Sequence, residues 1–157
     1  MAAESEFSTA CEAGDVEAVT KLLEKEVISV DQLQKGLSRA AWRNHPAVAD
    51  ILLSKGAKVD WSSFMGSTNR GDPTMFQVFV NHGFDINSTE FDEGTPLRMS
   101  AGHEDLTRWL LAHGADPNVA HDRAPSPLVS AAVTEKGYSS MRLLLEHGAA
   151  LEPNILH

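Results

Sequence analysis

Histidine is the residue type of this chain that most readily suggests chemistry, because imidazole binds metals and transfers protons near neutral pH. The 157 residues include seven histidines. Five of them recur at two positions of a repeated phrase: His82, His113 and His147 at one, His45 and His103 at the other. Equivalent positions of stacked repeats lie about 10 Å apart, too far to share one zinc ion with Zn–N bonds of about 2 Å. We therefore expect structural or solvent-facing histidines and no metal site.

The other reactive side chains also favour structural roles. Cys11 stands where a small helix residue faces the neighbouring repeat, so we expect a packed thiol rather than a nucleophile. The acidic pair Glu104-Asp105 begins a helix, where negative charge is favourable, and Asp92-Glu93 lies in a polar stretch surrounded by solvent. No His-Glu-x-x-His, glycine-rich phosphate loop or Gly-x-Ser-x-Gly occurs. The sequence predicts no enzyme, no catalytic residue and no cofactor, and only His121, beside Asp122, retains some freedom for another role.

Charge and composition restrict the class of partner. With 13 Lys and Arg against 22 Asp and Glu, the formal net charge is −9, which disfavours nucleic acid and anionic membranes. No apolar run approaches the roughly 20 residues that span a bilayer. The single cysteine excludes an intramolecular disulfide, and the first residues lack the basic and apolar regions of a signal peptide. We expect an intracellular monomer, in the cytoplasm or nucleus, that binds a protein.

A short phrase with glycine as its next-to-last residue occurs four times and indicates the helices that must position these side chains. It reads Leu-Leu-Ala-His-Gly-Ala at 110–115, and its glycines, Gly56, Gly83, Gly114 and Gly148, follow one another at 27, 31 and 34 residues. This period is typical of stacked helix pairs. Apolar residues at three-to-four spacing predict five second helices, at 16–23, 47–53, 74–80, 105–111 and 140–145.

The first helix of each pair carries small residues, which allow neighbouring helices to approach closely. We expect these first helices to be the shorter ones, as at 8–11, 38–41 and 130–132. The segments 26–36 and 60–64 are predicted to be brief links. Longer polar stretches after Asn87 and Asn118 precede Thr95-Pro96-Leu97 and Ser126-Pro127-Leu128. Each of these stretches predicts a projecting β-turn or hairpin finger.

The stretch from Gly94-Thr95-Pro96-Leu97 through Gly102-His103 to Gly114-Ala115-Asp116-Pro117-Asn118 resembles the ankyrin-repeat family. Weaker similarity extends over about residues 5–152. The resemblance implies an all-α solenoid of about five helix-turn-helix units with β-turn or hairpin fingers, and a concave face that binds protein. We expect one array over 1–157, with units at about 4–29, 30–60, 61–88, 89–119 and 120–152.

Two departures from the family pattern concern the ends of the units. The brief links resemble the irregular arrays of fungal ankyrin proteins. The final residues, 153–157, resemble the opening of a further unit without its helix, so we expect a truncated or capping unit and a chain cut from a longer protein.

The resemblance also implies where a partner binds, because the groove of an ankyrin array is lined by finger tips and by the last residues of each first helix. The compressed fourth unit leaves Ser100-Ala101 unassigned. Matched position by position, the remaining candidates are Glu12-Ala13, Trp42, Arg43, Asn69, Arg70 and Thr134-Glu135 on helices, and Phe91, Asp92, Asp122 and Arg123 on fingers.

We therefore expect a non-catalytic interaction module that binds a protein partner through its concave face and fingers. Trp and Arg often anchor interfaces. The acidic first finger predicts a basic patch on the partner. One alternative for Trp42 is that it covers the link at 31–36, and one for Phe91 is that it folds back on its own finger. Alternatives for the chain are a structural spacer or regulatory domain of a larger protein, or a small-molecule or catalytic site built in the groove.

Overall fold

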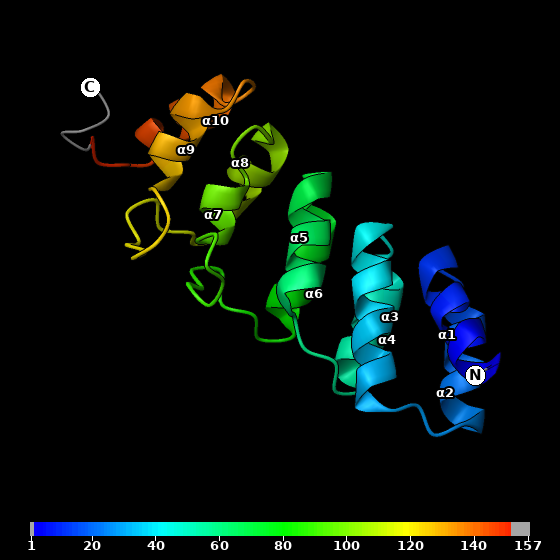
Figure 1. Ribbon diagram of the computed structural model, residues 1–157. Coiled ribbons are helices and arrows are strands. Elements are labelled where there is room, and N and C mark those ends of the chain that lie inside the picture. Colours follow the sequence, from blue (N-terminus) through cyan, green and yellow to red (C-terminus); the bar gives the residue numbers. More distant parts are fainter. Residues whose placement is uncertain (1, 152–157) are drawn as a thin grey trace. The chain divides into compact units, whose positions relative to one another are not determined.

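The computed structural model describes residues 2–151 and contains ten α-helices in that range, with no β-strand among the described residues (Figure 1). The expected stub at 153–157 lies outside the described residues. By its internal contacts the chain divides into two compact units, Met1–Phe84 and Asp85–His157, called unit 1 and unit 2 below. The single array over 1–157 stays a prediction. In the described part of the chain, no helix is long and apolar enough to cross a membrane.

Unit 1 consists of three helix pairs in two layers. The first helix of each pair packs on the next, α1 on α3 and α3 on α5, and the second helices α2, α4 and α6 also follow one another (Figure 1). Their bounds are α1 Ala2–Ala13, α2 Val16–Lys25, α3 Val30–Trp42, α4 Pro46–Ser54, α5 Trp61–Arg70 and α6 Pro73–Asn81.

Unit 2 contains two shorter helix pairs, each preceded by a loop. The helices are α7 Pro96–Met99, α8 Glu104–Ala112, α9 Pro127–Val133 and α10 Tyr138–Glu146. The first helix α7 packs on α9, and the second helix α8 packs on α10. The loops at 85–94 and 116–125 are the two predicted fingers, formed by turns and bends and without strands.

All five predicted second helices are present, because each has a buried apolar face, and three of them also begin with a capping side chain or a proline. Val19, Leu52, Phe79, Leu110 and Leu144 are each at most 1% exposed. Asp15 and Asp72 accept hydrogen bonds from backbone N–H groups in the first turns of α2 and α6. Prolines begin α4 and α6, where the missing N–H is harmless.

The predicted links at 26–36 and 60–64 are wrong, because most of both segments is helical. Helix α3 already begins at Val30 and α5 at Trp61. Ser29 and Gln32 exchange side-chain and backbone hydrogen bonds in a capping box before α3, and Asp60 and Ser63 do the same before α5. The loops that remain are brief, as expected. Short first helices occur only in unit 2, at α7 and α9.

Side-chain amides tie successive repeats together at the base of the fingers. Asn87 donates to the backbone oxygen of Gly114 at 3.2 Å and accepts from the N–H of Asp116 at 2.8 Å. Asn118 makes the same pair of bonds to Gly148 and Ala150. These bonds satisfy backbone groups that no strand pairs, so they fix the points from which each finger projects.

Candidate functional site

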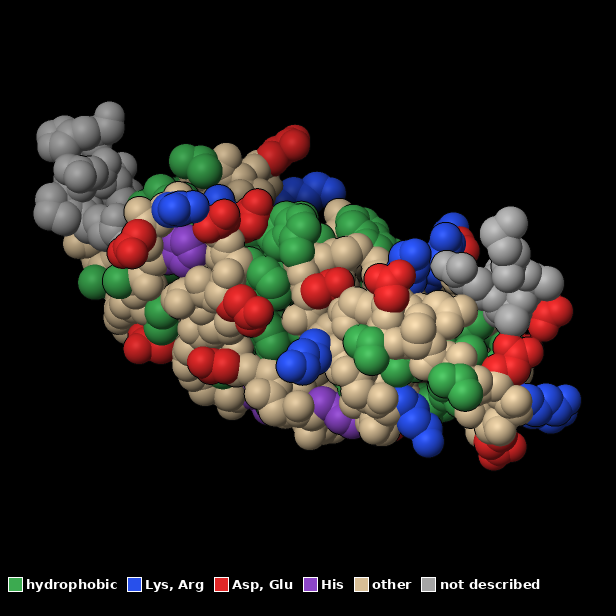
Figure 2. Space-filling view, turned by 60° about the horizontal axis from the view of Figure 1, so that its bottom comes forward, with side chains coloured by type: hydrophobic (Ala, Val, Ile, Leu, Met, Phe, Trp, Pro, Cys, Tyr) green, Lys and Arg blue, Asp and Glu red, His purple; other side chains and the backbone are tan. Residues whose placement is uncertain are grey.

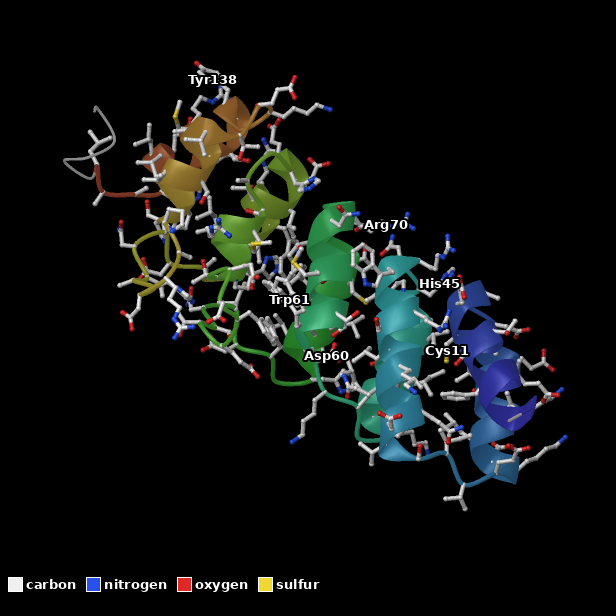
Figure 3. The ribbon with its side chains drawn as sticks, viewed as in Figure 1. Cys11, His45, Asp60, Trp61, Arg70 and Tyr138 are labelled. Atoms are coloured by element: carbon white, nitrogen blue, oxygen red, sulfur yellow. The ribbon has the colours of Figure 1, made fainter. Side chains whose placement is uncertain are left out.

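The ends of three first helices form an exposed surface in unit 1, which we call the helix-end surface. Helices α1, α3 and α5 all end at turns that lie on one side of the unit, with Arg70 and His45 near that side and Asp60 and Trp61 at the opposite end of α5 (Figure 3). A hollow of about 370 Å³ lies on it. The surface comprises Glu12, Ser38, Arg39, Trp42, Arg43 and Arg70, of which the first five line the hollow.

Glu12 is bound by two arginines of the next repeat. Arg39 Nη1 lies 2.8 Å from Glu12 Oε2, and Arg43 donates to Oε1 through Nη2 at 2.9 Å and Nε at 3.2 Å. The hydrogen bond from Arg43 is the largest cause that lowers the pKa of Glu12 below its ordinary value. Both arginine side chains remain at least half exposed. The surface thus presents positive charge although the chain is acidic.

Trp42 is fixed by contacts with α5, while the residue as a whole stays 40% exposed. Its indole Nε1 donates to Ser62 Oγ at 3.3 Å, and Arg70 Nε donates to its backbone oxygen at 3.0 Å. A Cβ built on Gly66 would stand 2.9 Å from the Trp42 nitrogen and 3.0 Å from its ring, so only glycine lets α5 approach this closely. The alternative that Trp42 covers a link at 31–36 is wrong, because that segment belongs to α3.

Two of the predicted helix positions are exposed without a described role. Asn69 is exposed beside Arg70 at the end of α5. In unit 2, Glu135 is exposed, whereas the hydroxyl of Thr134 donates to the Ser130 backbone oxygen at 2.6 Å. The structure therefore brings Trp42, Arg43 and Arg70 together and leaves Asn69 at the margin of the surface.

The predicted finger residues form a second exposed surface, in unit 2, which we call the finger surface. A hollow of about 210 Å³ is lined by Thr89 and Asp92 of the first finger and by residues 120–123 of the second. Arg123 Nη1 lies 3.3 Å from Asp92 Oδ1, with both side chains about three-quarters exposed. Phe91 is half-buried, whereas Asp122 is exposed. Three of the four predicted finger residues thus line one hollow.

His121 connects the two fingers, and sequence reasoning did not identify this role. Its Nε2 lies 2.9 Å from the Phe91 backbone oxygen, and its Nδ1 accepts the Arg123 backbone N–H at 3.1 Å. Because Nε2 faces a carbonyl oxygen and Nδ1 faces an N–H donor, the geometry favours the neutral ring protonated at Nε2. Both ring nitrogens are therefore occupied, and the ring positions the finger backbone instead of offering a free ligand.

The three histidines that precede the repeat glycines, His82, His113 and His147, bind backbone or carboxylate oxygens. His113 and His147 each place Nδ1 2.8 Å from the carbonyl four residues earlier in their own helices. His82 instead places Nε2 2.6 Å from Asp50 Oδ1. Among the side chains of residues 6–151, no three of His, Cys, Asp or Glu gather closely enough to hold a metal ion.

Cys11 is packed in the interior of unit 1. Its side chain is 0% exposed, and burial raises the pKa of the thiol to about 12, against a smaller opposing effect of Arg39. A thiol with so high a pKa holds almost no thiolate at neutral pH, so Cys11 is a poor nucleophile.

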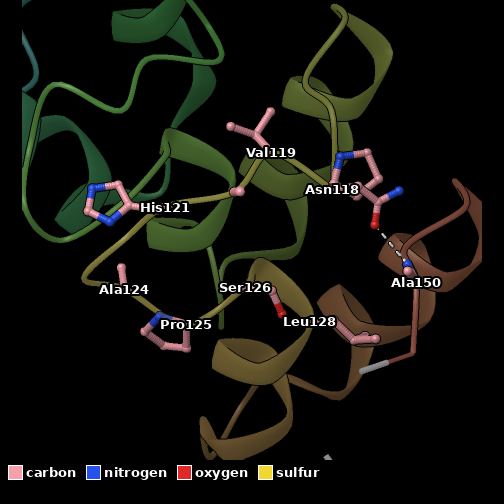
Figure 4. A pocket seen from close by; sticks show the side chains of 10 residues that line it. Asn118, Val119, His121, Ala124, Pro125, Ser126, Leu128 and Ala150 are labelled. Atoms are coloured by element: carbon pink, nitrogen blue, oxygen red, sulfur yellow. Dashed lines mark hydrogen bonds between the residues drawn. The ribbon is translucent and has the colours of Figure 1, made fainter. Parts of the chain in front are cut away.

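A further pocket, of about 390 Å³, lies beneath the second finger (Figure 4). His121 is the one titratable side chain of its ten lining residues, which are Pro117, Asn118, Val119, Ala120, His121, Ala124, Pro125, Ser126, Leu128 and Ala150. Catalysis in a groove would need at least two converging ionisable groups. This pocket does not bring two such groups together.

The face drawn in Figure 2 carries acidic and basic side chains interspersed with hydrophobic ones.

Comparison with known proteins gives a consistent family. A family model for ankyrin repeats, in three copies, matches residues 64–155. Ankyrin repeat and SOCS box protein 6 is 29% identical in Pongo abelii and 28% identical in Homo sapiens, each over 160 residues and 89% of this chain. The chain spans 38% of the length of these relatives. Protein HOS4 of Saccharomyces cerevisiae is 32% identical over 84 residues, which cover 52% of this chain and 8% of that protein.

Two solved structures share the fold. The ankyrin repeat domain of human ASB11 has a TM-score of 0.77 at 23% identity and covers 93% of this chain and 70% of that one. The ankyrin repeat domain of Bcl-3 has a TM-score of 0.74 at 23% identity, covering 92% of this chain and 72% of that one.

Proposed function

The chain belongs to the ankyrin-repeat family, whose fold is generally a non-catalytic module of protein–protein interaction, and we propose that it binds a protein partner through two surfaces. These are the helix-end surface of unit 1 and the finger surface of unit 2. An intracellular location and a monomeric state belong to the same proposal.

The observation that carries this proposal is the state of Trp42. This residue is 40% exposed, and its large aromatic side chain is already fixed by contacts with α5, so it loses little conformational freedom on binding. Arg39 and Arg43 lie beside it in the same hollow. Trp and Arg are the residue types that most often contribute strongly to interface affinity. This combination supports a partner-binding role over a purely structural one.

The finger surface supports a basic patch on the same partner. Asp92, Asp122 and Glu90 are exposed around it, and Arg123 is the cation paired with Asp92. Exposed acidic groups of this kind steer a basic partner toward the surface and increase the rate of association.

Site-specific photo-crosslinking tests the proposal. A photoreactive amino acid replaces Arg43 in one variant and Asp122 in another, and it replaces Tyr138, an exposed aromatic residue of α10, in the control. We expect the first two variants to crosslink the same cellular protein and the control to crosslink none. Trp42→Ala is expected to reduce that crosslinking, and the comparison is made at a temperature at which thermal unfolding shows the variant to be folded, because Trp42 also packs on α5.

Other outcomes would support the remaining alternatives. If all three positions crosslink the same set of proteins at similar yield, binding is not confined to these surfaces, and a spacer role gains support. If a small metabolite copurifies and is lost when Ala150→Trp, at an exposed residue of the lining, narrows the pocket beneath the second finger, a small-molecule site gains support.

A further inference from the structure

We propose that the helix-end surface binds an acidic segment of its protein partner. In this arrangement the segment's carboxylates lie on Arg39, Arg43 and Arg70, and an apolar side chain lies on the indole of Trp42. The inference rests on the proposed function and specifies the chemistry of the partner at this surface.

The first support is the local charge, which is opposite to that of the whole chain. The chain carries a formal net charge of −9, yet three arginines lie on this surface with one carboxylate, that of Glu12. Asp15 and Asp72, in the neighbouring turns, are also acidic, but neither lines the hollow, and their carboxylates bind backbone N–H groups in the first turns of α2 and α6. Because the surface is positive where the average is negative, it selects acidic groups of a partner.

The second support is the geometry around Glu12, which shows how a carboxylate binds here. One oxygen accepts from Arg39 and the other from Arg43, so a single carboxylate bridges two guanidinium groups. The Glu12 side chain is 36% exposed, and water and salt screen such exposed ion pairs, so a partner carboxylate can join or replace it at little cost.

The third support is that an apolar side chain, that of Trp42, lies next to the arginines of the helix-end surface. Trp42 lines the same hollow as Arg39 and Arg43, while Arg70 donates to its backbone oxygen. Gly66 and Ser62 fix the ring against α5. A segment that combines acidic residues with one aliphatic or aromatic residue therefore matches both components.

Selection from a random peptide library displayed on phage tests this inference, with the full chain as the target. We expect recovered sequences to be enriched in Asp and Glu next to an aliphatic or aromatic residue. Affinity for a recovered acidic peptide should fall about tenfold in the Arg43→Ala, Arg70→Ala double variant, because two charged contacts are lost. Arg142→Ala, an exposed arginine of α10, is the matched control and should leave affinity unchanged.

Glu12→Gln separates binding from structural support. Because the amide no longer competes for the arginines, affinity for the acidic peptide should rise about threefold, within the energy of an exposed ion pair. A purely structural Glu12 predicts the opposite sign, and a loss of affinity in this variant overturns the inference. Recovery of peptides without acidic enrichment, or an unchanged affinity in the arginine double variant, also overturns it. The inference is likewise overturned if an oligonucleotide binds the chain through Arg43 more tightly than any recovered peptide does.

The outcomes distinguish this inference from the proposed function. If the only recovered peptides are basic and their binding depends on Asp92, the acidic partner is excluded while protein binding stands. If no peptide is recovered and no position crosslinks a protein, both proposals fail.

Discussion

The imidazole of His45 lies under Gly14, so that a residue of the second repeat supports the turn of the first. Its Nε2 is 2.9 Å from the Glu12 backbone oxygen, and a Cβ built on Gly14 would stand 2.4 Å from its Nδ1. Gly14 also has φ +72°, in the left-handed region. The same turn carries Glu12 of the helix-end surface, so this contact also positions a residue of the candidate site.

Gly14→Ala should therefore lower the free energy of unfolding more than Gly83→Ala. The two glycines have φ +72° and +91°, where a side chain strains the backbone by about 1–2 kcal/mol, but no atom lies within 4 Å of a Cβ on Gly83. The clash with His45 should add about 1–3 kcal/mol at Gly14 alone. Urea denaturation measures both variants. Introducing Gly14→Ala into a His45→Ala background should remove the added loss, and equal losses at the two glycines would contradict the contact.

Burial predicts a second contrast, within unit 2. Leu110 of α8 is 0% exposed, so Leu110→Ala should lower the free energy of unfolding by about 2–5 kcal/mol through the cavity it leaves. Leu145 of α10 is 42% exposed, and Leu145→Ala should cost well under half as much. Chemical denaturation followed by circular dichroism compares the two. Similar losses would mean that Leu145 is buried in solution.

The second helices could be predicted because their signals are local. Apolar residues at helical spacing and the glycines that follow them need no knowledge of the rest of the fold. The early beginnings of α3 and α5 also had local signals, in the capping pairs Ser29 with Gln32 and Asp60 with Ser63. The repeat pattern instead indicated a link at these positions, and the prediction followed the repeat pattern rather than the capping residues.

The candidate site was predictable only in part. The repeat pattern predicts which residues lie at the surface positions, but it does not predict which side chains contact one another. Trp42, Arg43 and Arg70 occupy repeat positions that the family pattern selects. The role of Arg39 depends on its distance from Glu12, 27 residues earlier, and that of His121 on a backbone oxygen 30 residues away. Helical spacing does place Arg39 one turn before Arg43 on the same face, which was the available hint.

Burial of Cys11 predicts both low reactivity and a pH dependence. Because the pKa of its thiol rises from an ordinary 9.0 to about 12 in the folded protein, the folded state keeps the proton that the unfolded state loses first. The corresponding stability is fully present below about pH 9 and is lost as the pH rises toward about 12. Cys11→Ala should therefore lose less stability than the unmodified chain across this range. Iodoacetamide should label Cys11 only after denaturation, and rapid labelling of the folded chain at neutral pH would contradict its burial.

Charge reversal at Asp92 separates binding at the finger surface from folding. Asp92 and Arg123 are about three-quarters exposed, and such a pair contributes at most about 1 kcal/mol, so Asp92→Lys should leave thermal unfolding nearly unchanged. Phe91 is a less clean choice, because it is half-buried and its truncation would affect folding as well as binding. Asp105→Lys is the matched control, since Asp105 is an exposed acid of the same unit at the beginning of α8.

If the finger surface steers a basic partner, Asp92→Lys should lower the affinity for the partner identified by crosslinking about tenfold, mainly through slower association. Asp105→Lys should change that affinity little. The association rate of the unmodified chain should fall as salt is added, because mobile ions screen exposed charges over about 10 Å at 0.1 M ionic strength. The Asp92→Lys variant should show a weaker salt dependence, since part of the steering charge is already reversed. Surface plasmon resonance at several salt concentrations measures these rates. Equal rates for the two variants would place the steering charge elsewhere on this acidic chain and would leave the fingers without a role in recognition.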